Sequence, residues 1–382
     1  MGRGIWIRNG RVMDPARGID RTEDILIRDG RIVPFSPDEA GKAAEEIDAA
    51  GCLVLPGLID FHAHLAHRMT DTGVNPDLMA LPNGITAAVD AGSVGTAGAD
   101  AFVRNIIGGC ETTIRLFVNV SAVGVATEQY PENPDPARFD EDAILAICGK
   151  HPDHILGLKL RLGKGFSPGL GLKPLIRAKE IARRAGRPLC VHLTNSEFPY
   201  ADLLDRLEGG DILCHCFQGM GEHSILDANG RVGGAARRAR ARGVIFDAAV
   251  GRINYDLALV RKALADGFPP DVLSTDVVAT SVYQRKLFHL LYVMSLFLAL
   301  GLPLMEVVRA CTAAPAALMR LGGRIGTLAP GAEGDAAIFR LRQGPVEFRD
   351  QYGHSAAGNL LLAPLATVKA GRTAYKRIDF EF

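Results

Sequence analysis

The chain has 382 residues, its 43 lysines and arginines are balanced by 43 aspartates and glutamates, and 48% of its residues are hydrophobic. This neutral balance argues against a protein that holds a polyanion electrostatically, and the hydrophobic content argues against disorder. The length suits two domains, or one large α/β barrel with an appendage. Seven cysteines without a CxxC pair predict a reducing, cytoplasmic location.

Two stretches bear on possible macromolecular partners. Residues 287–305 lack Asp, Glu, Lys and Arg, but they contain His289 and are interrupted by Gly301 and Pro303, so they predict two buried helices rather than a membrane span. The N-terminus has no apolar run long enough for a signal peptide. The basic run 235–243 has no aromatic residues and predicts a solvated helix face. We therefore expect neither a membrane nor a nucleic-acid partner.

Both ends of the chain have a β-type pattern. Short apolar runs there are separated by Asn-Gly, Asp-Gly and Pro-Gly pairs, which favour turns. The predicted strands are residues 4–8, 11–13, 24–28, 31–34, 336–341 and 366–370. We predict one small composite β-sandwich domain, formed by residues 1–54 together with residues 323–382.

The middle of the chain, residues 55–322, alternates short apolar runs with helical patterns. The predicted strands are residues 57–62, 85–91, 114–120, 155–161, 188–193, 211–216, 244–248 and 272–275. The helical patterns include residues 172–185, 200–207, 232–242 and 257–265. Eight βα units predict an α/β fold with a (β/α)8 TIM barrel, which needs about 250 residues. Neither GxGxxG nor GxxxxGK[ST], the nucleotide-binding fingerprints, is present.

Metal-ligating residue types recur at the ends of the predicted barrel strands. The motif DFHAH ends the first strand, and because residues two apart share a face of a strand, His62 and His64 both point into the barrel mouth. His192 ends the fifth strand, His215 the sixth and Asp276 the eighth. Barrel enzymes build their sites at these ends. Because imidazoles and carboxylates bind zinc and related ions, the sequence predicts a metal site.

Lys159 lies inside the apolar run of the fourth strand. A lone lysine in a buried strand is costly unless it is paired or neutralised. One interpretation is an ion pair with Asp90 or Asp247. The other is reaction with CO2 to a carbamate, whose two oxygens would bridge two cations.

These features together resemble the amidohydrolase superfamily across essentially the whole chain. The segments GLIDFHAHL, VDAGSVG, LGLKLRL, DILCHCFQG, GVIFDAA and LSTD are similar to a dihydroorotase-like group of amidohydrolase/deacetylase metallohydrolases. The resemblance implies two metal ions bridged by the lysine carbamate, the second held by the histidines of strands five and six. The metal ligands that it implies are His62, His64, carboxylated Lys159, His192, His215 and Asp276.

The resemblance also implies a reaction, the hydrolysis of an amide or ester bond by a hydroxide between the two metals. Asp276 would act as the general base and then as the general acid. Zinc suits these ligands best, and Mn, Co and Fe are alternatives. We expect a small carboxylate-bearing acyl substrate, for example an N-acetyl-D-amino acid or an acetylated 2-hydroxy acid that is deacetylated. A homo-oligomer is compatible with the sequence.

Four further residues are candidates for contact with the substrate. Arg161 shares a strand face with the barrel lysine, and it either binds a substrate carboxylate or pairs in the core with Asp90 or Asp247. Asp90 and Ser93, in the loop after the second strand, are expected to contact the substrate or to support the metal ligands. Asn254, after the seventh strand, is the fourth candidate.

Two departures from the related groups bear on the substrate. Dihydroorotase-type sites continue HxH with an arginine, where this chain has Leu65 and Ala66, and the Gly-His-Gly of the deacetylase-like group is replaced by Ala-Val-Gly at residues 249–251. Two alternatives stay open. One is a hydrolase of cyclic amides or imides, similar to dihydroorotase or hydantoinase, and the other is a catalytically inactive barrel with a structural or regulatory role.

Three cysteines lie beside predicted ligands. Cys214 and Cys216 flank His215, so strand alternation predicts that both point away from the metals, into the layer between barrel and helices. Cys190 shares a face with His192, one layer deeper, and is expected to pack in the core.

Overall fold

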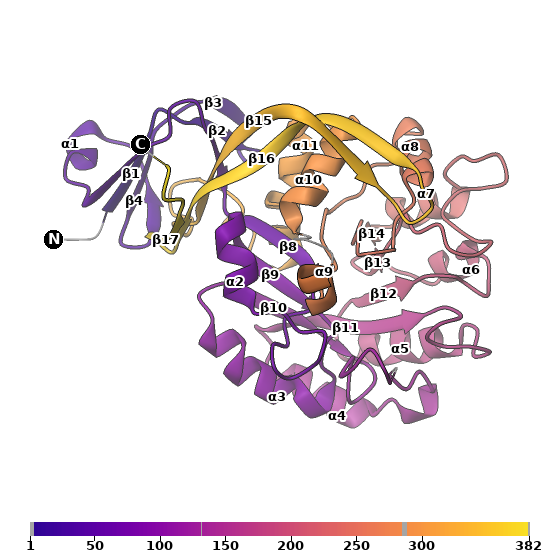
Figure 1. Ribbon diagram of the computed structural model, residues 1–382. Helices are drawn as coiled ribbons and strands as arrows, with labels where there is room; N and C mark the ends of the chain where they lie inside the picture. The colour runs from indigo at the N-terminus through magenta and orange to yellow at the C-terminus, as the bar shows by residue number, and fades with distance from the viewer. Residues whose placement is uncertain (1–3, 131, 285–288, 381–382) are drawn as a thin grey trace.

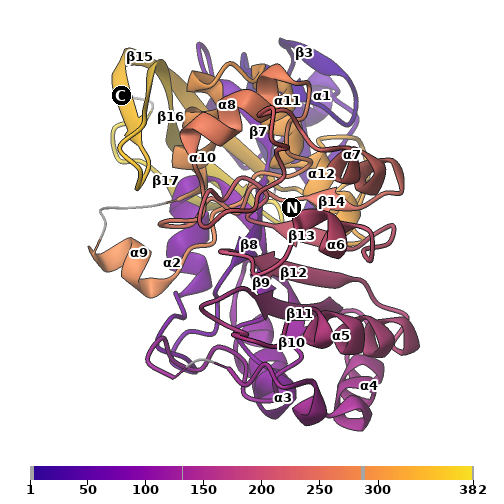
Figure 2. The same ribbon diagram turned by 90° about the vertical axis from the view of Figure 1, so that its right-hand side faces the viewer.

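The computed structural model describes residues 4–130, 132–284 and 289–380, and its strands form three sheets. A seven-stranded parallel sheet curls through the middle of the chain, and sheets of four and six strands lie beside it (Figure 1). Helices α3, α4 and α5 pack in a row against the outside of the curled sheet, as Figure 1 and Figure 2 show. The predicted α/β barrel with an additional β domain is confirmed.

The strands of the curled sheet follow chain order, each parallel to the next. They are β8 (Leu58–Ala63), β9 (Ile85–Ala91), β10 (Thr113–Asn119), β11 (Ile155–Leu162), β12 (Leu189–Leu193), β13 (Ile212–Cys214) and β14 (Ile245–Phe246). Nearly all of their residues are buried. Helices on one side and barrel interior on the other bury both faces, which is why these strands are near-continuous apolar runs in the sequence.

The eighth predicted strand, residues 272–275, is not a regular strand. Asp247 forms an isolated parallel bridge with Val272, and the backbone N–H of Asp276 donates to the carbonyl of His62 at 2.7 Å. These contacts join the segment to the chain beyond β14 on one side and to β8 on the other. The sheet therefore closes into a barrel through separate bonds rather than a continuous ladder.

Helices follow the strands around the outside of the barrel. The longer ones are α3 (Thr96–Asn105), α4 (Glu141–Lys150), α5 (Lys173–Arg184), α7 (Gly234–Ala241), α8 (Leu257–Ala265) and α10 (Leu290–Ala299). The shorter ones are α2 (Pro76–Ala80), α6 (Tyr200–Leu204), α9 (Ala279–Gln284), α11 (Leu304–Ala310) and α12 (Ala313–Leu318), with 3-10 turns η1 (Leu81–Asn83), η2 (Ile107–Gly109) and η3 (Pro136–Arg138). Side-chain caps start several of them; the Asp256 carboxylate, for example, accepts hydrogen bonds from the N–H groups of Ala258 and Leu259 in the first turn of α8. The four helical patterns that the sequence predicts are therefore confirmed.

The apolar stretch 287–305 contains α10 and the start of α11, separated by a turn at Gly301. Most residues of α10 are buried. Residues 287 and 288 lie outside the described part of the chain. Among the described residues, no helix combines the length and apolar character that crossing a membrane requires.

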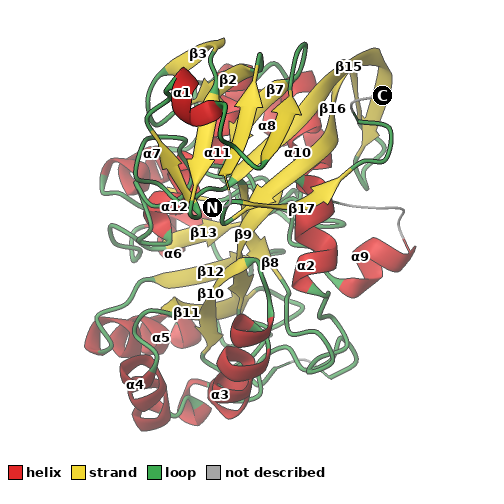
Figure 3. Cartoon of the chain, turned by 90° about the vertical axis from the view of Figure 1, so that its left-hand side faces the viewer, coloured by secondary structure: helices red, strands yellow, loops and turns green. Residues whose placement is uncertain are grey.

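Of the remaining two sheets, the four-stranded one is built from the N-terminal part alone, and the six-stranded one combines strands from both ends of the chain (Figure 3). One has the order β5 (Arg31–Val33), β4 (Ile25–Arg28), β1 (Gly4–Arg8), β6 (Glu45–Asp48). The other has the order β17 (Arg372–Lys376), β16 (Ser355–Lys369), β15 (Ala336–Arg349), β7 (Leu53–Pro56), β2 (Arg11–Asp14), β3 (Ile19–Thr22). A short helix, α1 (Pro37–Ala40), follows β5. One apolar cluster, with Ile27 and Ile47 from the N-terminal part and Ile338 and Val368 from the C-terminal part, fills the space between them. The boundaries near residues 54 and 323 stay a prediction.

Strands β15 and β16 form a hairpin much longer than the sequence indicates. The predicted runs covered only its inner ends, because its outer part is half-exposed and mixes polar with apolar residues. The hairpin arches over α10 towards α8 (Figure 1). There the Tyr255 hydroxyl donates to the carbonyl of Arg349 at 2.7 Å, and the Asp350 carboxylate accepts from the N–H of Leu257 at 2.8 Å. The terminal sheets are thus tied to the side of the barrel where the strands end.

Candidate active site

The carboxyl ends of the barrel strands surround a cavity of about 490 Å³. The predicted site residues that line it are His62, His64, Lys159, Arg161, His192, Asn254 and Asp276. His215 lies against them, with its ring centre 4.3 Å from that of His192 and 5.3 Å from that of His62. The structure therefore brings all six predicted metal ligands together.

The two histidines of β8 are each held by their Nδ1 atom. His62 Nδ1 lies 3.1 Å from Asp247 Oδ2, and His64 Nδ1 lies 2.8 Å from Ser93 Oγ. The Nε2 atoms point the other way, to within 3.6 Å and 3.3 Å of Asp276 Oδ1. A partner on one ring nitrogen fixes the tautomer and the direction in which the other nitrogen is presented.

His215 shows that the site suits a cation. Its Nδ1 lies 2.7 Å from the carbonyl oxygen of Ala249, while its Nε2 is buried and has no hydrogen-bond partner among the described residues. Ligand atoms of His62, His215 and Asp276 all lie within 4.8 Å of one another. Burial lowers the pKa of His215 to about 3, so at neutral pH the ring is neutral, which is the form that binds metals. A buried, neutral, unpartnered nitrogen beside a carboxylate fits a divalent metal ion.

His192 presents its ring in the opposite sense. Its Nε2 lies 3.0 Å from Thr194 Oγ1, which leaves Nδ1 as the nitrogen available to a ligand. Burial lowers the pKa of His192 well below its usual value, and its proximity to His215 and Arg161 lowers it further. This imidazole is therefore also neutral at neutral pH.

Lys159 is buried at the centre of the site. Its Nζ lies 3.2 Å from His62 Nε2, and the ion pair with Asp90 or Asp247 that the sequence left open is not formed within the described structure. Its side chain crosses Gly92, where a Cβ atom would come within 2.5 Å of the lysine side chain and where φ is +86°. Only glycine fits there. The carbamate on this lysine stays a prediction.

Arg161 pairs with a residue that sequence reasoning missed. Its Nη1 donates to Glu132 Oε2 at 3.1 Å, and its guanidinium carbon lies 3.8 Å from the centre of the Phe166 ring. The alternative of core pairing with Asp90 or Asp247 is therefore wrong. Glu132 lies in an irregular loop before α4, where no sequence pattern indicated a role.

Of the other three candidates for substrate contact, only Asn254 lines the cavity. Asp90 is fully buried and accepts hydrogen bonds from the N–H groups of Leu65 at 2.7 Å and Ser93 at 2.8 Å. Burial takes its carboxylate off the cavity wall, so the structure does not form the expected substrate contact and gives Asp90 a supporting role. Ser93 supports His64 through its hydroxyl. Asn254 does line the cavity, and its Nδ2 donates to Asp276 Oδ2 at 3.0 Å.

Cys214 points into the barrel, and the prediction that it faces the helix layer is wrong. Its Sγ lies 3.2 Å from Lys159 Nζ and 3.4 Å from Cys190 Sγ. The reason is the backbone of His215, whose φ of +56° lies in the left-handed region. Alternation of faces ends where β13 ends, so both 214 and 215 face the interior. Cys216 packs in the main core, as expected.

Two buried aspartates support the site. Besides His62, Asp247 accepts a hydrogen bond from Ser274 Oγ at 2.5 Å. Asp60 accepts hydrogen bonds from the N–H of Thr275 at 3.0 Å and from its hydroxyl at 2.6 Å. Burial raises the pKa of Asp60 to about 7, although these hydrogen bonds act to lower it. Sequence position offered a signal for both, because Asp60 opens the DFHAH motif and Asp247 lies near the end of the predicted seventh strand.

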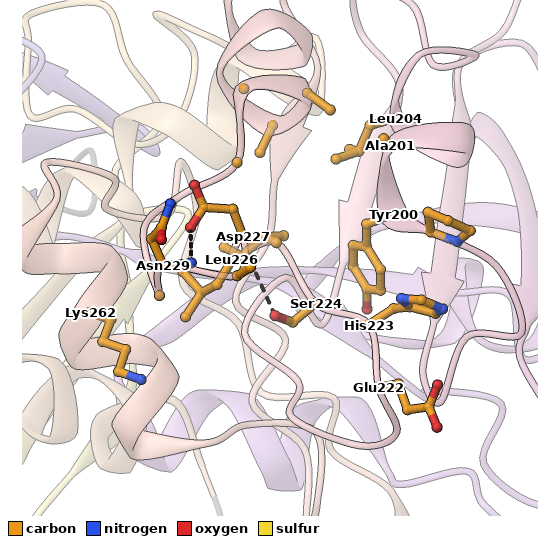
Figure 4. Close-up of a pocket in the computed structure, with 18 residues that line it drawn as sticks. Tyr200, Ala201, Leu204, Glu222, His223, Ser224, Leu226, Asp227, Asn229 and Lys262 are labelled. Carbon is orange, nitrogen blue, oxygen red and sulfur yellow. Dashed lines mark hydrogen bonds between the residues drawn. The ribbon is translucent and has the colours of Figure 1, made fainter.

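A larger cavity, of about 760 Å³, lies beside α6 and the start of α7, and the histidine that lines it, His223, is not a predicted ligand (Figure 4). Two of its polar side chains are engaged in local turns: Asp227 accepts from the N–H of Asn229 at 2.9 Å, and Ser224 accepts from the N–H of Leu226 at 3.1 Å. None of the predicted ligands lines it. The smaller cavity is therefore the candidate active site.

Comparison with known proteins shows the family to which the chain belongs. The sequence profile described as "Amidohydrolase family" matches residues 53–374. The chain is 30% identical over 348 residues to a deacetylase of Brucella anthropi, which covers 90% of this chain and 86% of that protein. It is 31% identical over 344 residues to a deacetylase of Agrobacterium fabrum, which covers 89% and 84% of the two chains.

Solved structures give the same fold with different activities. A crystal structure of an adenine deaminase superposes with a TM-score of 0.89 at 26% identity and covers 98% of this chain and 100% of its own. A crystal structure of a dihydroorotase superposes with a TM-score of 0.87 at 30% identity and covers 97% and 98%. Because these relatives bear different activity names, the fold does not select the substrate, and the cavity wall must be considered.

Proposed function

Because this chain belongs to the amidohydrolase family, it is a metal-dependent hydrolase that acts on C–N bonds, and we propose that it removes the acyl group from a small carboxylate-bearing compound. N-acetyl-D-amino acids and acetylated 2-hydroxy acids are the proposed substrates. The observation that carries this proposal is that Arg161 lines the same cavity as the histidines and Asp276. The relatives named deacetylases support the choice of an acyl group.

The proposed cofactors are two divalent metal ions and a carbamate formed from CO2 on the Lys159 amine. Lys159 and Asp276, with the two histidines of β8, would hold one metal, and His192 with His215 would hold the other. When bound, the metals supply Lewis acidity, which polarises the acyl carbonyl and lowers the pKa of a water molecule. Zinc suits the nitrogen and oxygen donors best, and Mn, Co and Fe are alternatives.

Asp276 is the proposed general base. Burial on its own would raise the pKa of Asp276, but the hydrogen bond from His64 and the neighbouring His215 and His62 lower it well below the usual range. The carboxylate is therefore ionised at neutral pH and can accept a proton from the attacking water, then donate it to the leaving nitrogen or oxygen. Asn254 holds Oδ2 and so fixes the direction of the other oxygen.

Arg161 is the proposed anchor for the substrate carboxylate. Glu132 engages Nη1, and among the described residues no partner engages Nε or Nη2. Phe166 stacks on the guanidinium and restricts its movement. A planar group with free N–H donors suits a carboxylate. The cavity volume of about 490 Å³ suits a small molecule.

A cyclic amide or imide is the second candidate substrate. The dihydroorotase likeness, at 30% identity over nearly the whole chain, favours it. Leu65 and Ala66 weigh against it, because they stand where dihydroorotase-type sites carry an arginine. The acyl substrate is therefore the first choice.

A substrate panel tests the proposal. Enzyme loaded with Zn²⁺ or Mn²⁺ in bicarbonate is assayed with N-acetyl-D- and N-acetyl-L-amino acids, acetylated 2-hydroxy acids, dihydroorotate, hydantoin and dihydrouracil, and its metal content is measured by mass spectrometry. We expect hydrolysis of acyl compounds and about two metals per chain. Hydrolysis of ring substrates alone would select the second candidate, and protein that neither binds metal nor gains activity from it would contradict both.

Variants test the roles of individual residues. Lys159→Ala and Asp276→Asn should each abolish measurable turnover, because one removes the carbamate site and the other the base. Lys164→Ala and Asp227→Asn are matched controls at exposed positions and should retain activity. Unchanged activity in either site variant would exclude the role proposed for the residue that it replaces.

A further inference from the structure

Two thiols lie directly beneath the proposed metal ligands, and the proposed hydrolysis uses neither of them. Cys190 and Cys214 are on the neighbouring strands β12 and β13, their Sγ atoms are 3.4 Å apart, and both are buried. Lys159 Nζ lies 3.2 Å from Cys214 Sγ and 3.9 Å from Cys190 Sγ. The lysine that carries the proposed carbamate therefore rests on a pair of sulfur atoms.

His62 completes a ligand set with these thiols. A ring nitrogen of His62 and the two Sγ atoms all lie within 4.8 Å of one another. Two sulfur ligands of a tetrahedral ion are about 3.8 Å apart when each metal–sulfur bond is about 2.3 Å, which is close to the separation of the two thiols. One imidazole and two thiolates form a soft donor set, which prefers ions such as Cd²⁺ and Cu⁺ to Mg²⁺ or Mn²⁺.

We propose that Cys190, Cys214 and His62 form an additional cation site, distinct from the two proposed metal positions, which captures a soft metal ion and thereby inhibits the hydrolase. Binding of a divalent ion forms two metal–sulfur bonds and releases the two thiol protons to solvent, so the two thiolates balance its charge. His62 and Lys159 also line the active-site cavity, which gives the ion a route to the thiols.

Inhibition follows because the two sites share His62. An ion held by the thiols engages the imidazole that the hydrolytic metal needs, and it lies against the amine that must react with CO2. The two modes of metal loading therefore exclude each other. This consequence rests on the proposed function, whereas soft-metal binding by the thiols does not.

Cadmium titration of the metal-free protein tests the binding. We expect an ultraviolet thiolate-to-cadmium charge-transfer band that saturates at one ion per chain, with two sulfur neighbours in X-ray absorption at the cadmium edge. The band should be lost in Cys190→Ala/Cys214→Ala and kept in Cys216→Ala, a buried cysteine of the same segment that faces the other side of the barrel wall. If X-ray absorption shows only nitrogen and oxygen neighbours around cadmium in the wild-type protein, the proposed thiol site is wrong. This measurement does not depend on whether the cysteine variants fold.

Competition tests the inhibition and separates the two proposals. Saturating Zn²⁺ with bicarbonate should raise the Cd²⁺ concentration at half-saturation of the band at least tenfold, because linkage between the sites is reciprocal. If zinc does not change the Cd²⁺ concentration at half-saturation, the two sites do not share His62. A thiolate band without any acyl hydrolase activity would contradict the proposed function and leave the soft-metal site supported. Acyl hydrolase activity without a thiolate band would contradict the soft-metal site and leave the proposed function supported.

Discussion

At the scale of single residues, Asp247 determines how His62 is presented. It is fully buried, and it accepts hydrogen bonds from the imidazole, from Ser274 and from the N–H of Ala249. With three donors around it, the carboxylate has one stable orientation. A ligand held in this way binds metal without first losing rotamer freedom, which is how groups behind a ligand strengthen a metal site.

Asp247→Asn should weaken metal binding about 10- to 100-fold, because the amide presents N–H groups to neighbours that are themselves donors. Competition with a chelator of known affinity measures the change. Asp100→Asn is the matched control, since Asp100 also contacts a histidine, His151 at 2.6 Å, but lies at the surface. Equal metal affinities for the two variants would show that Asp247 does not strengthen the metal site.

Arg161 allows a prediction about the substrate. Arg161→Lys keeps the charge but loses the planar pair of donors, so kcat/KM for a carboxylate-bearing acyl compound should fall about 10- to 100-fold. The corresponding amide, which has no carboxylate, should lose far less. Steady-state kinetics with this pair of substrates measure the change. An equal decrease in kcat/KM for both substrates would show that Arg161 does not bind the carboxylate.

At the scale of elements, the β15–β16 hairpin links the terminal sheets to the barrel through its tip. The Asp350 side chain is fully buried and accepts from three backbone N–H groups, those of Leu257, Tyr352 and His354, at 2.8 to 2.9 Å. One of these belongs to the first turn of α8. A single carboxylate therefore both closes the hairpin turn and docks it on a barrel helix.

Asp350→Ala should lower the free energy of unfolding by about 1–3 kcal/mol, because it leaves the N–H of the buried residue Leu257 without its acceptor and removes two further hydrogen bonds in the hairpin turn. Urea unfolding measures the loss. Glu347→Ala, on the same hairpin but with a side chain that is about half exposed, is the control and should change stability by no more than about 0.5 kcal/mol. A loss no larger than that of the control would mean that the hairpin tip is not held by this carboxylate.

At the scale of the whole molecule, burial of ionisable groups makes stability depend on pH. His289 precedes α10, and its Nδ1 is buried without a partner among the described residues. Burial lowers the pKa of His289 to about 4, against about 6.5 for an unfolded chain. Between about pH 4 and about pH 6.5, His289 is therefore protonated in the unfolded state but largely neutral in the native state, so a lower pH favours unfolding.

The free energy of unfolding should therefore fall as the pH drops from about 6.5 to about 4, with up to about 3 kcal/mol of the loss due to His289. Urea unfolding across this range, compared between wild type and His289→Gln, isolates the contribution. His223→Gln, at a partly exposed loop histidine, is the control. If the wild type and His289→Gln have the same pH dependence, His289 is not the group responsible.

The sequence by itself determined the barrel, the composite terminal sheets and the residues that are predicted as metal ligands, which the fold brings together at one cavity. These properties depend on local spacing. Apolar runs of strand length, helical periodicity and a histidine two residues from another are all present in the chain before it folds, and parallel barrel strands bring their carboxyl ends to one edge.

Only the tertiary structure decided what surrounds those ligands. Glu132 reaches Arg161 from an irregular loop, Asp90 is fully buried, and the left-handed backbone at His215 turns Cys214 inwards. None of these contacts follows a periodic pattern or a fixed spacing in the sequence. Each depends on the residue at which a strand ends and on which residues of a distant loop pack against that end. The same physics explains why the reaction class follows from the chain, whereas the thiol pair beneath Lys159 is visible only in the folded protein.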